Sequence, residues 1–451
     1  MTYIKKYGIA LPHFRISDKV LHPRLGREVL HAVCYADEDI ITLAWQAAEK
    51  LGDEVDAVLF ATTTPVFKGR YHASYLADLL GLPDGITALD VGTTHRAGTD
   101  ALLLADALIT GGKHGNVLVV ASSISYPAIG KEVQTPFGHG AVAMILSKDK
   151  GIAQITHAAS YSEAFAEEFV YKGGQVKYDA RFAGTAGFLS NMKKVLAGLT
   201  PQGTSSLIIN SAYVKLIFNA LKKGGYDLEK QVAPDKLVPR FGFLGAAHGL
   251  LRLAFALENT PGISVLVDYN NGSNVITFDV AKNTAPVSSD SGNTTAIASY
   301  QDYLTLRKRG KFDGRGYESI EMFSSEMMQE REKSQFLRLK AFECKSCGTV
   351  YYLKAARCNN CKGTDFREKQ LSKTGTVYTL TSEYYFPISF PPANMIVIDL
   401  DGGGRITVQQ TDDMYQDEHT KISIGDKVKL VLRKMMENDK KPNYFWKCVK
   451  L

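Results

Sequence analysis

Four cysteines form two CxxC turns in the C-terminal part of the chain. Cys344 and Cys347 stand in Cys-Lys-Ser-Cys-Gly, and Cys358 and Cys361 stand in Cys-Asn-Asn-Cys-Lys-Gly. Each turn can direct two thiolates at one ion, and the glycine behind it permits a tight chain reversal. Four soft sulfur ligands with no fifth ligand describe a closed tetrahedral site, so the sequence predicts structural Zn²⁺ bound by these cysteines.

Two alternatives for the cysteines stay open at this point. They could form two disulfides or remain unrelated buried thiols, or one CxxC turn could perform redox exchange. The chain has only six cysteines, the other two being Cys34 and Cys448, and its start does not resemble a secretion signal. We therefore expect a reducing, cytoplasmic compartment, in which disulfides are disfavoured.

The composition predicts a soluble globular protein of more than one domain. The chain has 451 residues, of which 45% are hydrophobic and 22% are charged, and this length exceeds the usual size of one core. No apolar run is long enough to cross a bilayer, so no membrane association is expected. Residues 421–451 hold nine Lys or Arg against three Asp or Glu, which indicates a solvated strand face or an anion-binding surface.

The first 280 residues alternate apolar strand patterns with helix patterns, which predicts helices packed on a buried sheet. Two stretches repeat one plan of small-residue turn, apolar helix, stop and apolar strand. They read "AGTDALLLADALITGGKHGNVLVVAS" and "GAAHGLLRLAFALENTPGISVLVDYN". This repetition predicts an internal duplication.

The remainder of the chain divides at the cysteines. Residues 283–295 are rich in Ser, Asn, Thr, Asp and Gly and mark a linker, and a polar helical stretch follows through Leu339. Five strand patterns after the cysteines predict a small barrel of the OB type. They cover Thr376–Ser382, Met395–Leu400, Ile406–Gln410, Lys427–Arg433 and Tyr444–Val449. The predicted domains are residues 1–282, a linker and helical segment 283–340, a zinc ribbon 341–371 and an OB-fold domain 372–451.

These segments resemble two known families. "HRAGTDALLLADALI", "NVLVVASSIS", "PFGHGAVAMIL" and "GFLGAAHGLLRLAFALENTPG" resemble the thiolase-like superfamily, most closely its hydroxymethylglutaryl-CoA synthase branch. "CKSCG", "ARCNNCKG", "LSKTGTVYTLT" and "IGDKVKL" resemble the DUF35-type zinc-ribbon and OB-fold proteins that accompany thiolases. The resemblance implies an α/β protein with a duplicated thiolase-like five-layer αβαβα fold, followed by a rubredoxin-like zinc ribbon and a small OB-type β-barrel.

The resemblance also implies where synthase chemistry would lie. In the family, a cysteine at the start of the central helix of the first half attacks an acyl-CoA, because the helix N-terminus and a histidine lower its pKa. The matching positions here are His95 for the cysteine, Asn210 for the histidine and Thr63 for the acid. The sequence therefore predicts a degenerate site without a catalytic residue.

Three residues could replace the lost chemistry. Cys34 is the spare thiol of the head domain, but "HAVCYADEDI" resembles a structural segment. His95 could act as a base or fill a vacated pocket, and His248 is expected beside the same pocket with the same two roles.

The head domain is therefore expected to be an auxiliary subunit that keeps the fold and the homodimer surface of the family without its nucleophile. By resemblance, a thiolase subunit in a hetero-oligomeric complex supplies the cysteine for thiolytic cleavage or condensation of a 3-oxoacyl-CoA. The OB tail would bind the nucleotide part of coenzyme A, with Arg433 supplying positive charge and Tyr385 or Phe386 contacting adenine. The alternative is that these aromatic side chains fill the barrel core.

Two further function classes stay open. An independent synthase-, aldolase- or decarboxylase-like enzyme that forms no acyl-cysteine would depend on His95. Nucleic-acid binding is a third class because zinc ribbons and OB folds occur in it. The moderate net charge of +6 and the lack of a stacked aromatic pair with flanking basic residues argue against nucleic acid as a partner.

Overall fold

The structure is a computed structural model, and it divides the chain into two compact units. It describes residues 1–24, 28–52, 54–132, 137–172, 174–287, 294–307, 330–385, 388, 390–437 and 442–451. Unit 1 comprises Met1–Val33, Leu43–Asp78 and Leu82–Ile297, and unit 2 comprises Cys34–Thr42, Leu79–Gly81 and Ala298–Leu451. Two short N-terminal segments thus belong to the same unit as the C-terminal part of the chain.

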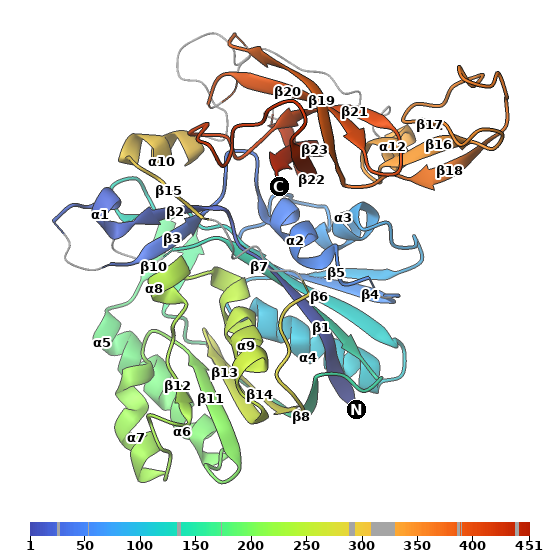
Figure 1. Ribbon diagram of the computed structural model, residues 1–451. Coiled ribbons are helices and arrows are strands. Elements are labelled where there is room, and N and C mark those ends of the chain that lie inside the picture. The colour runs from blue at the N-terminus through green and yellow to red at the C-terminus, as the bar shows by residue number, and fades with distance from the viewer. Residues whose placement is uncertain are drawn as a thin grey trace. The chain divides into compact units, whose positions relative to one another are not determined.

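Unit 1 is built on one ten-stranded sheet whose halves share one topology (Figure 1). The first half contains β1 (Thr2–Ala10), β4 (Ala57–Ala61), β5 (Thr87–Val91), β6 (Asn116–Ser123) and β7 (Gly140–Ser147). The second half contains β8 (Ala153–Ser162), β11 (Thr204–Asn210), β12 (Val232–Ala233), β13 (Gly262–Tyr269) and β14 (Gly272–Val280).

Numbered along the chain, the five strands of each half lie in the order 3-2-4-5-1. Strand 2 pairs in parallel with strands 3 and 4, and strand 5 pairs antiparallel with strands 4 and 1. Both halves follow this pattern without exception, so the predicted internal duplication is confirmed.

Two central helices, α4 (Ala97–Thr110) and α9 (His248–Asn259), share one hydrophobic core with both halves of the sheet. They approach closely at Gly98, where a Cβ would lie 2.5 Å from the carbonyl oxygen of Ala246. Strand residues alternate between this core and the opposite face, because side chains along a strand point to opposite sides. For example, Leu59 belongs to the central core, whereas buried Phe60 contacts His72.

Outer helices complete the five layers. On the first half these are α2 (Ile40–Ala48) and α3 (His72–Leu79). On the second half, α6 (Ser190–Ala197) and α7 (Phe218–Lys223) belong to a second core with β11 and β13. The αβαβα arrangement expected from the sequence is therefore observed.

Smaller elements fill the rest of unit 1. They are β2 (Phe14–Ser17), α1 (Asp18–Leu21), β3 (Leu30–Val33), β9 (Glu168–Tyr171), β10 (Gly174–Lys177), α5 (Ala180–Phe182), the π-helix η2 (Ala183–Leu189), η3 (Val214–Ile217), α8 (Val238–Phe241), η4 (Gly245–Ala247) and β15 (Thr295–Ala296).

Unit 2 contains a small ribbon and a closed barrel. The ribbon has the strand order β17-β16-β18, and the barrel closes in the order β19-β20-β21-β23-β22. The ribbon strands are β16 (Lys340–Cys344), β17 (Val350–Tyr351) and β18 (Phe366–Gln370). The barrel strands are β19 (Thr374–Glu383), β20 (Ala393–Leu400), β21 (Arg405–Gln410), β22 (Lys427–Glu437) and β23 (Pro442–Lys450). All five barrel strands predicted from the sequence are confirmed.

The helical segment predicted before the cysteines is only partly described. It contains α10 (Tyr300–Arg307) and α12 (Lys333–Phe336), and residues 308–329 lie outside the described residues. The four-part domain division drawn from the sequence stays a prediction. Within the described ranges, every helix is too short or too polar to span a membrane.

Candidate functional sites

The four cysteines meet in one cluster on the ribbon of unit 2. Their sulfur atoms all lie within 4.8 Å of one another. The Cys344 and Cys361 sulfurs are 3.5 Å apart, and so are those of Cys347 and Cys358. A disulfide requires about 2.05 Å, and all six cysteines of the chain carry free thiols. The disulfide alternative is therefore wrong for this structure.

The donor set fits a tetrahedral metal ion. Four sulfurs at about 2.3 Å from a central zinc would be separated by about 3.8 Å, which falls within the observed spacing. The Gly348 N–H donates to the Cys344 carbonyl at 2.8 Å, and the Lys362 N–H donates to the Cys358 carbonyl at 2.9 Å. Gly348 and Lys362 both take left-handed conformations, so the second turn uses a lysine where the sequence suggested a glycine.

His95, the residue at the family's nucleophile position, lies just before the N-terminal end of α4 in unit 1. The His95 backbone N–H donates to Asn270 Oδ1 at 3.2 Å, and its ring meets that of Phe243 edge-on at 5.2 Å. His95 Nδ1 is buried and has no hydrogen-bond partner among the described residues. Burial, and to a smaller extent His248, lower the pKa of His95, so the imidazole is neutral at neutral pH.

Ser123 places a second unpartnered group beside His95. The Ser123 hydroxyl, at the end of β6, is buried and lacks a hydrogen-bond partner within the described part of the chain. A Cβ on Gly245 would lie 2.3 Å from Ser123 Oγ and 3.6 Å from His95 Nδ1. The two unpartnered polar atoms thus lie near each other and near the N-terminus of the fourteen-residue helix α4.

Asn210, at the end of β11, joins a buried carboxyl group that the sequence analysis did not identify. Asn210 Nδ2 donates to Asp268 Oδ1 at 2.8 Å, and Thr99 Oγ1 donates to Asp268 Oδ2 at 2.8 Å. Asn274 Nδ2 donates to Thr99 Oγ1 at 3.0 Å and extends the network. Burial raises the pKa of Asp268 to about 6, although the two hydrogen bonds oppose this shift.

His248, the first residue of α9, is fully buried and also contacts Phe243. The two rings lie 4.8 Å apart. His248 Nε2 lies 2.8 Å from Asp235 Oδ2, and His248 Nδ1 accepts from the Leu244 N–H at 3.3 Å. Burial lowers the pKa of His248, so the neutral ring donates from Nε2. Thr63 is half-buried in the loop after β4, and no described contact joins it to either histidine.

Unit 1 contains no cysteine. All six cysteines of the sequence fall within unit 2, including buried Cys34. No thiol of unit 1 can therefore form an acyl-cysteine. The lack of a catalytic residue in the thiolase-like domain stays a prediction.

Arg433 lies buried in unit 2, where acidic residues surround it. Its Nη2 lies 3.1 Å from Glu38 Oε1 and 3.0 Å from Asp412 Oδ2, and its Nε lies 3.4 Å from Asp37 Oδ1. Lys447 Nζ lies 2.8 Å from Asp37 Oδ2. Burial opposes the charge of Arg433, but the carboxylates raise its pKa above the ordinary value. The side chain predicted to contact coenzyme A thus has acids of this chain as its partners.

Comparison with known proteins accounts for both parts of the chain. Residues 368–433 match the family model of the ChsH2 C-terminal OB-fold domain. A DUF35 domain-containing scaffold protein of Methanocaldococcus jannaschii is 36% identical over 99 residues, which are 21% of this chain and 67% of that protein. A hydroxymethylglutaryl-CoA synthase of Caldivirga maquilingensis is 24% identical over 288 residues, which are 58% of this chain and 82% of that protein. The chain is a thiolase-like domain fused to a DUF35-type OB-fold domain.

A solved structure supports the fold of the thiolase-like domain. PksG, a hydroxymethylglutaryl-CoA synthase from Bacillus subtilis, superposes with a TM-score of 0.57 at 17% identity. The match covers 68% of this chain and 88% of that protein. At this identity the likeness establishes the fold alone, so the chemistry of the thiolase-like domain rests on its own residues.

The coenzyme A contact predicted for Phe386 stays untested, whereas the structure revises the prediction for the basic residues near the C-terminus. Phe386 lies outside the described residues, and neighbouring Tyr385 is 86% exposed. Arg433, Lys434 and Lys447 are buried. The basic run of residues 421–451 is therefore only partly a surface feature, because it contributes cations to the interior of unit 2.

Proposed function

We propose that this fusion protein is an auxiliary, non-catalytic subunit of a thiolase-type acyl-CoA acyltransferase complex. The lack of any cysteine in unit 1, with neutral His95 at the nucleophile position, carries this proposal. A separate thiolase subunit supplies the cysteine thiolate for thiolytic cleavage or condensation of a 3-oxoacyl-CoA. The name of the synthase relative supports a coenzyme A ester as the substrate class.

The fusion holds the complex together through its two domains. The similarity of the tail to a protein named as a DUF35 scaffold supports this role. The thiolase-like domain forms a homodimer within the hetero-oligomer. Strand β5 ends the described sheet, and an unpaired strand edge is suited to pairing with a second copy.

Zinc bound by the four cysteines has a structural role in this proposal. Four thiolates fill a tetrahedral coordination sphere and leave no position for a substrate. We expect one zinc per chain by elemental analysis, and Cys358→Ser should remove it and unfold the ribbon, because structural zinc contributes folding free energy. A full-length protein that folds normally and contains no zinc contradicts this assignment.

The OB tail contacts the nucleotide part of coenzyme A through exposed aromatic side chains near residue 385. The exposure of Tyr385 supports this location, and Phe386 is the neighbouring contact predicted from the sequence. Arg433 is the weaker candidate because its guanidinium has three carboxylate partners. Tyr385→Ala should weaken coenzyme A binding by the complex, whereas Tyr378→Ala, at another exposed tyrosine, serves as the matched control.

Reconstitution tests the auxiliary role. The tagged full chain is purified with the cysteine-bearing thiolase that it captures, and thiolysis of acetoacetyl-CoA is compared for each protein alone and for the mixture. We expect no activity from the full chain alone and full activity of the complex with the His95→Ala variant. Thiolysis by the isolated chain at the rate of the complex overturns the proposal.

One observation favours a second candidate, an independent enzyme without an acyl-cysteine. His95 Nδ1 and Ser123 Oγ are buried, unpartnered within the described residues and close to the same point. In this alternative, His95 acts as a general base on a substrate in the pocket. His95→Ala and Ser123→Ala would then each abolish an activity of the isolated chain, which the auxiliary role does not predict.

A further inference from the structure

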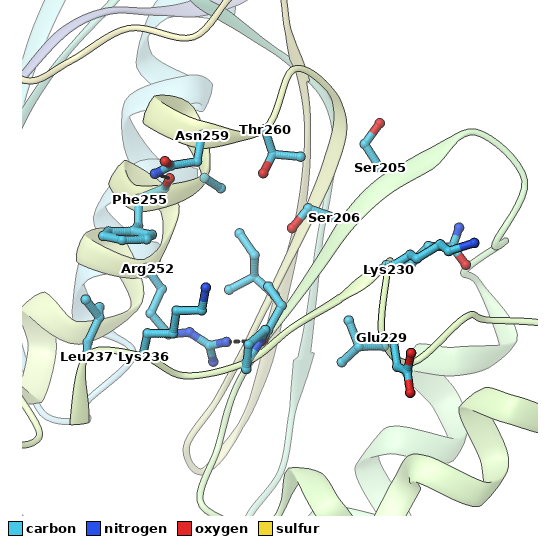
Figure 2. Close-up of a pocket in the computed structure, with 16 residues that line it drawn as sticks. Ser205, Ser206, Glu229, Lys230, Lys236, Leu237, Arg252, Phe255, Asn259 and Thr260 are labelled. Carbon is cyan, nitrogen blue, oxygen red and sulfur yellow. Dashed lines mark hydrogen bonds between the residues drawn. The ribbon is translucent and has the colours of Figure 1, made fainter. Parts of the chain in front are cut away.

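The thiolase-like unit contains a cavity that the family positions do not explain. It has a volume of about 260 Å³ and lies between β11, β12 and α9 (Figure 2). Strand β12 has only two residues, whereas β5, its counterpart in the first half, has five. The short edge strand leaves room beside α9, so the cavity arises where the two halves differ.

Two cations meet at one end of this cavity. Lys236 is exposed, and it lies beside Arg252 in Figure 2; no described residue forms an ion pair with it. Arg252 is buried and donates to the Ile209 carbonyl and, at 2.7 Å, to the Ala233 carbonyl. These hydrogen bonds use two of its five N–H groups, and Asp235 Oδ2 lies 4.0 Å from Nε. Both side chains can therefore still bind an anion.

The rest of the lining is of mixed polarity, and it includes Glu229 and Lys230, which lie on the wall opposite Arg252 in Figure 2. Ser206 and Asn259 offer a hydroxyl and an amide, and Ile208 and Phe255 offer apolar surface. The C-terminal end of α9 lies at Asn259, where the exposed carbonyls of a helix disfavour an anion. An anionic ligand is thus oriented with its charge toward Lys236 and its neutral end toward Asn259.

We propose that this cavity binds a small hydroxy- or oxo-carboxylate. The carboxylate faces Lys236 and Arg252, the short carbon chain contacts Ile208 and Phe255, and the hydroxyl or carbonyl oxygen bonds to Ser206 or Asn259. The volume lies just below the range of about 300–1,000 Å³ that is usual for small-molecule sites, so a compact metabolite fits and a nucleotide does not. The proposal is independent of the acyltransferase role.

Calorimetric titration of the full-length protein tests this site with four probes of similar size. We expect 3-hydroxybutanoate to bind more tightly than butanoate, and roughly tenfold more tightly than inorganic phosphate, which lacks a carbon chain. Butan-1-ol, which lacks the charge, should give no binding. The Ser206→Ala variant should reduce the preference for 3-hydroxybutanoate over butanoate.

A matched pair of lysine variants locates the ligand. Lys236→Met should weaken 3-hydroxybutanoate binding by roughly tenfold, because it removes one charge-assisted contact. Lys230→Met should change it by less than about twofold, because Lys230 lies on the opposite wall in Figure 2 and pairs with Asp227 at 3.7 Å. Both lysines are exposed, so the fold should tolerate both changes.

Three outcomes overturn the proposal. The first is no binding of any carboxylate to the full-length protein. The second is an equal loss of affinity in the two lysine variants, which places the ligand elsewhere. The third is phosphate binding as tight as that of 3-hydroxybutanoate, which reduces the cavity to a nonselective anion site.

Discussion

The site around His95 in unit 1 and the ion cluster around Arg433 in unit 2 bury polar groups in opposite ways. At the first site, His95 Nδ1 and Ser123 Oγ have no hydrogen-bond partner among the described residues. In the cluster, Arg433 and Lys447 face the carboxylates of Glu38, Asp412 and Asp37. Burying a polar group without a partner is unfavourable, so the two regions serve different purposes.

Buried polar groups without a partner and buried charges with a partner contribute differently to the stability of the fold. An unpartnered buried hydroxyl or imidazole becomes favourable only when a bound molecule supplies the missing partner. A buried charge with an opposite charge beside it needs no ligand, but removing one partner leaves the other uncompensated. Substitutions in the two regions should therefore differ in their effect on stability.

The largest expected effect is that of Arg433→Met. Because Glu38, Asp412 and Asp37 would stay buried without their cation, the free energy of unfolding of unit 2 should fall by about 3–5 kcal/mol. Trp446 lies in unit 2 and Trp45 in unit 1, so urea unfolding in a Trp45→Phe background reports on unit 2 alone.

The control is Arg405→Met in the same barrel. Arg405 pairs with Asp399 at 2.6 Å, but both side chains are about half exposed, so the loss should stay below about 1 kcal/mol. Equal losses for the two arginines would show that burial adds nothing to the Arg433 ion pairs.

The second prediction concerns the pH dependence of unit 2. Burial raises the pKa of Glu38 from 4.5 to about 7, with Asp412 and Asp37 adding to the shift and Arg433 opposing it. Burial likewise raises the pKa of Asp413 to about 6. The folded state binds more protons than the unfolded state between pH 4.5 and 7, so stability should rise as pH falls through this window.

The expected gain from Glu38 alone is about 2–3 kcal/mol, to which Asp413 adds, measured by urea unfolding followed at Trp446. The pKa of Asp37 is lowered, so its protonation destabilises unit 2. This loss of stability occurs only below the ordinary pKa of an aspartate, outside the window between pH 4.5 and 7. Stability that falls steadily as the pH is lowered from 7 would contradict the prediction.

The third prediction concerns Asp268→Asn in unit 1, where a buried carboxyl group also has a raised pKa. The asparagine can still accept from Asn210 and can donate to Thr99 Oγ1, so the hydrogen bonds survive while the buried charge is removed. At neutral pH the free energy of unfolding should rise by about 1–3 kcal/mol. In the unsubstituted protein, protonation of Asp268 should stabilise unit 1 as the pH falls from about 6 to 3.8. The Asp268→Asn variant should lack this rise in stability.

Asp235→Asn supplies a control of opposite sign. Burial opposes the charge of Asp235, but His248 and Arg252 lower its pKa below the ordinary value. Its charge therefore stabilises the fold at neutral pH, and the substitution should destabilise unit 1. Trp45 fluorescence in a Trp446→Phe background measures both variants, and a destabilising effect of Asp268→Asn would contradict the assignment.

The smallest expected effect is that of Ser123→Ala. Its hydroxyl has no described partner, so the free energy of unfolding should change by less than about 0.5 kcal/mol. Ser273→Ala is the matched control, because buried Ser273 donates to Asn191 Oδ1 at 2.5 Å, and its loss should cost about 1–3 kcal/mol. A large loss of stability in Ser123→Ala would mean that this hydroxyl contributes to the fold and has a hydrogen-bond partner.

Local patterns allowed much of the fold to be predicted. The spacing of Cys344, Cys347, Cys358 and Cys361 determines that their sulfurs can meet, because each CxxC turn is a local structure. The five barrel strands and the duplicated helix-and-strand order are also local patterns of hydrophobic residues. The assignment of His95 to the position of the family cysteine rests on the sequence motif and stays a prediction.

Long-range pairing could not be predicted in this way. "CYADEDI" shows an acidic run that is ordinary on a surface, yet Asp37 pairs with Lys447, 410 residues further along the chain. The sequence showed the basic residues near the C-terminus but not that Arg433 and Lys447 are buried. Asp268 lies near the end of strand β13, but its raised pKa depends on burial, which no local signal reports.

The sequence by itself therefore determined the two families and the cysteine cluster, because each is a matter of residue type at short spacing. Only the tertiary structure decided which charges are buried and paired, which polar atoms lack partners, and where a cavity opens beside a short edge strand. These properties depend on burial and on contacts between distant segments, and both arise only when the chain has folded.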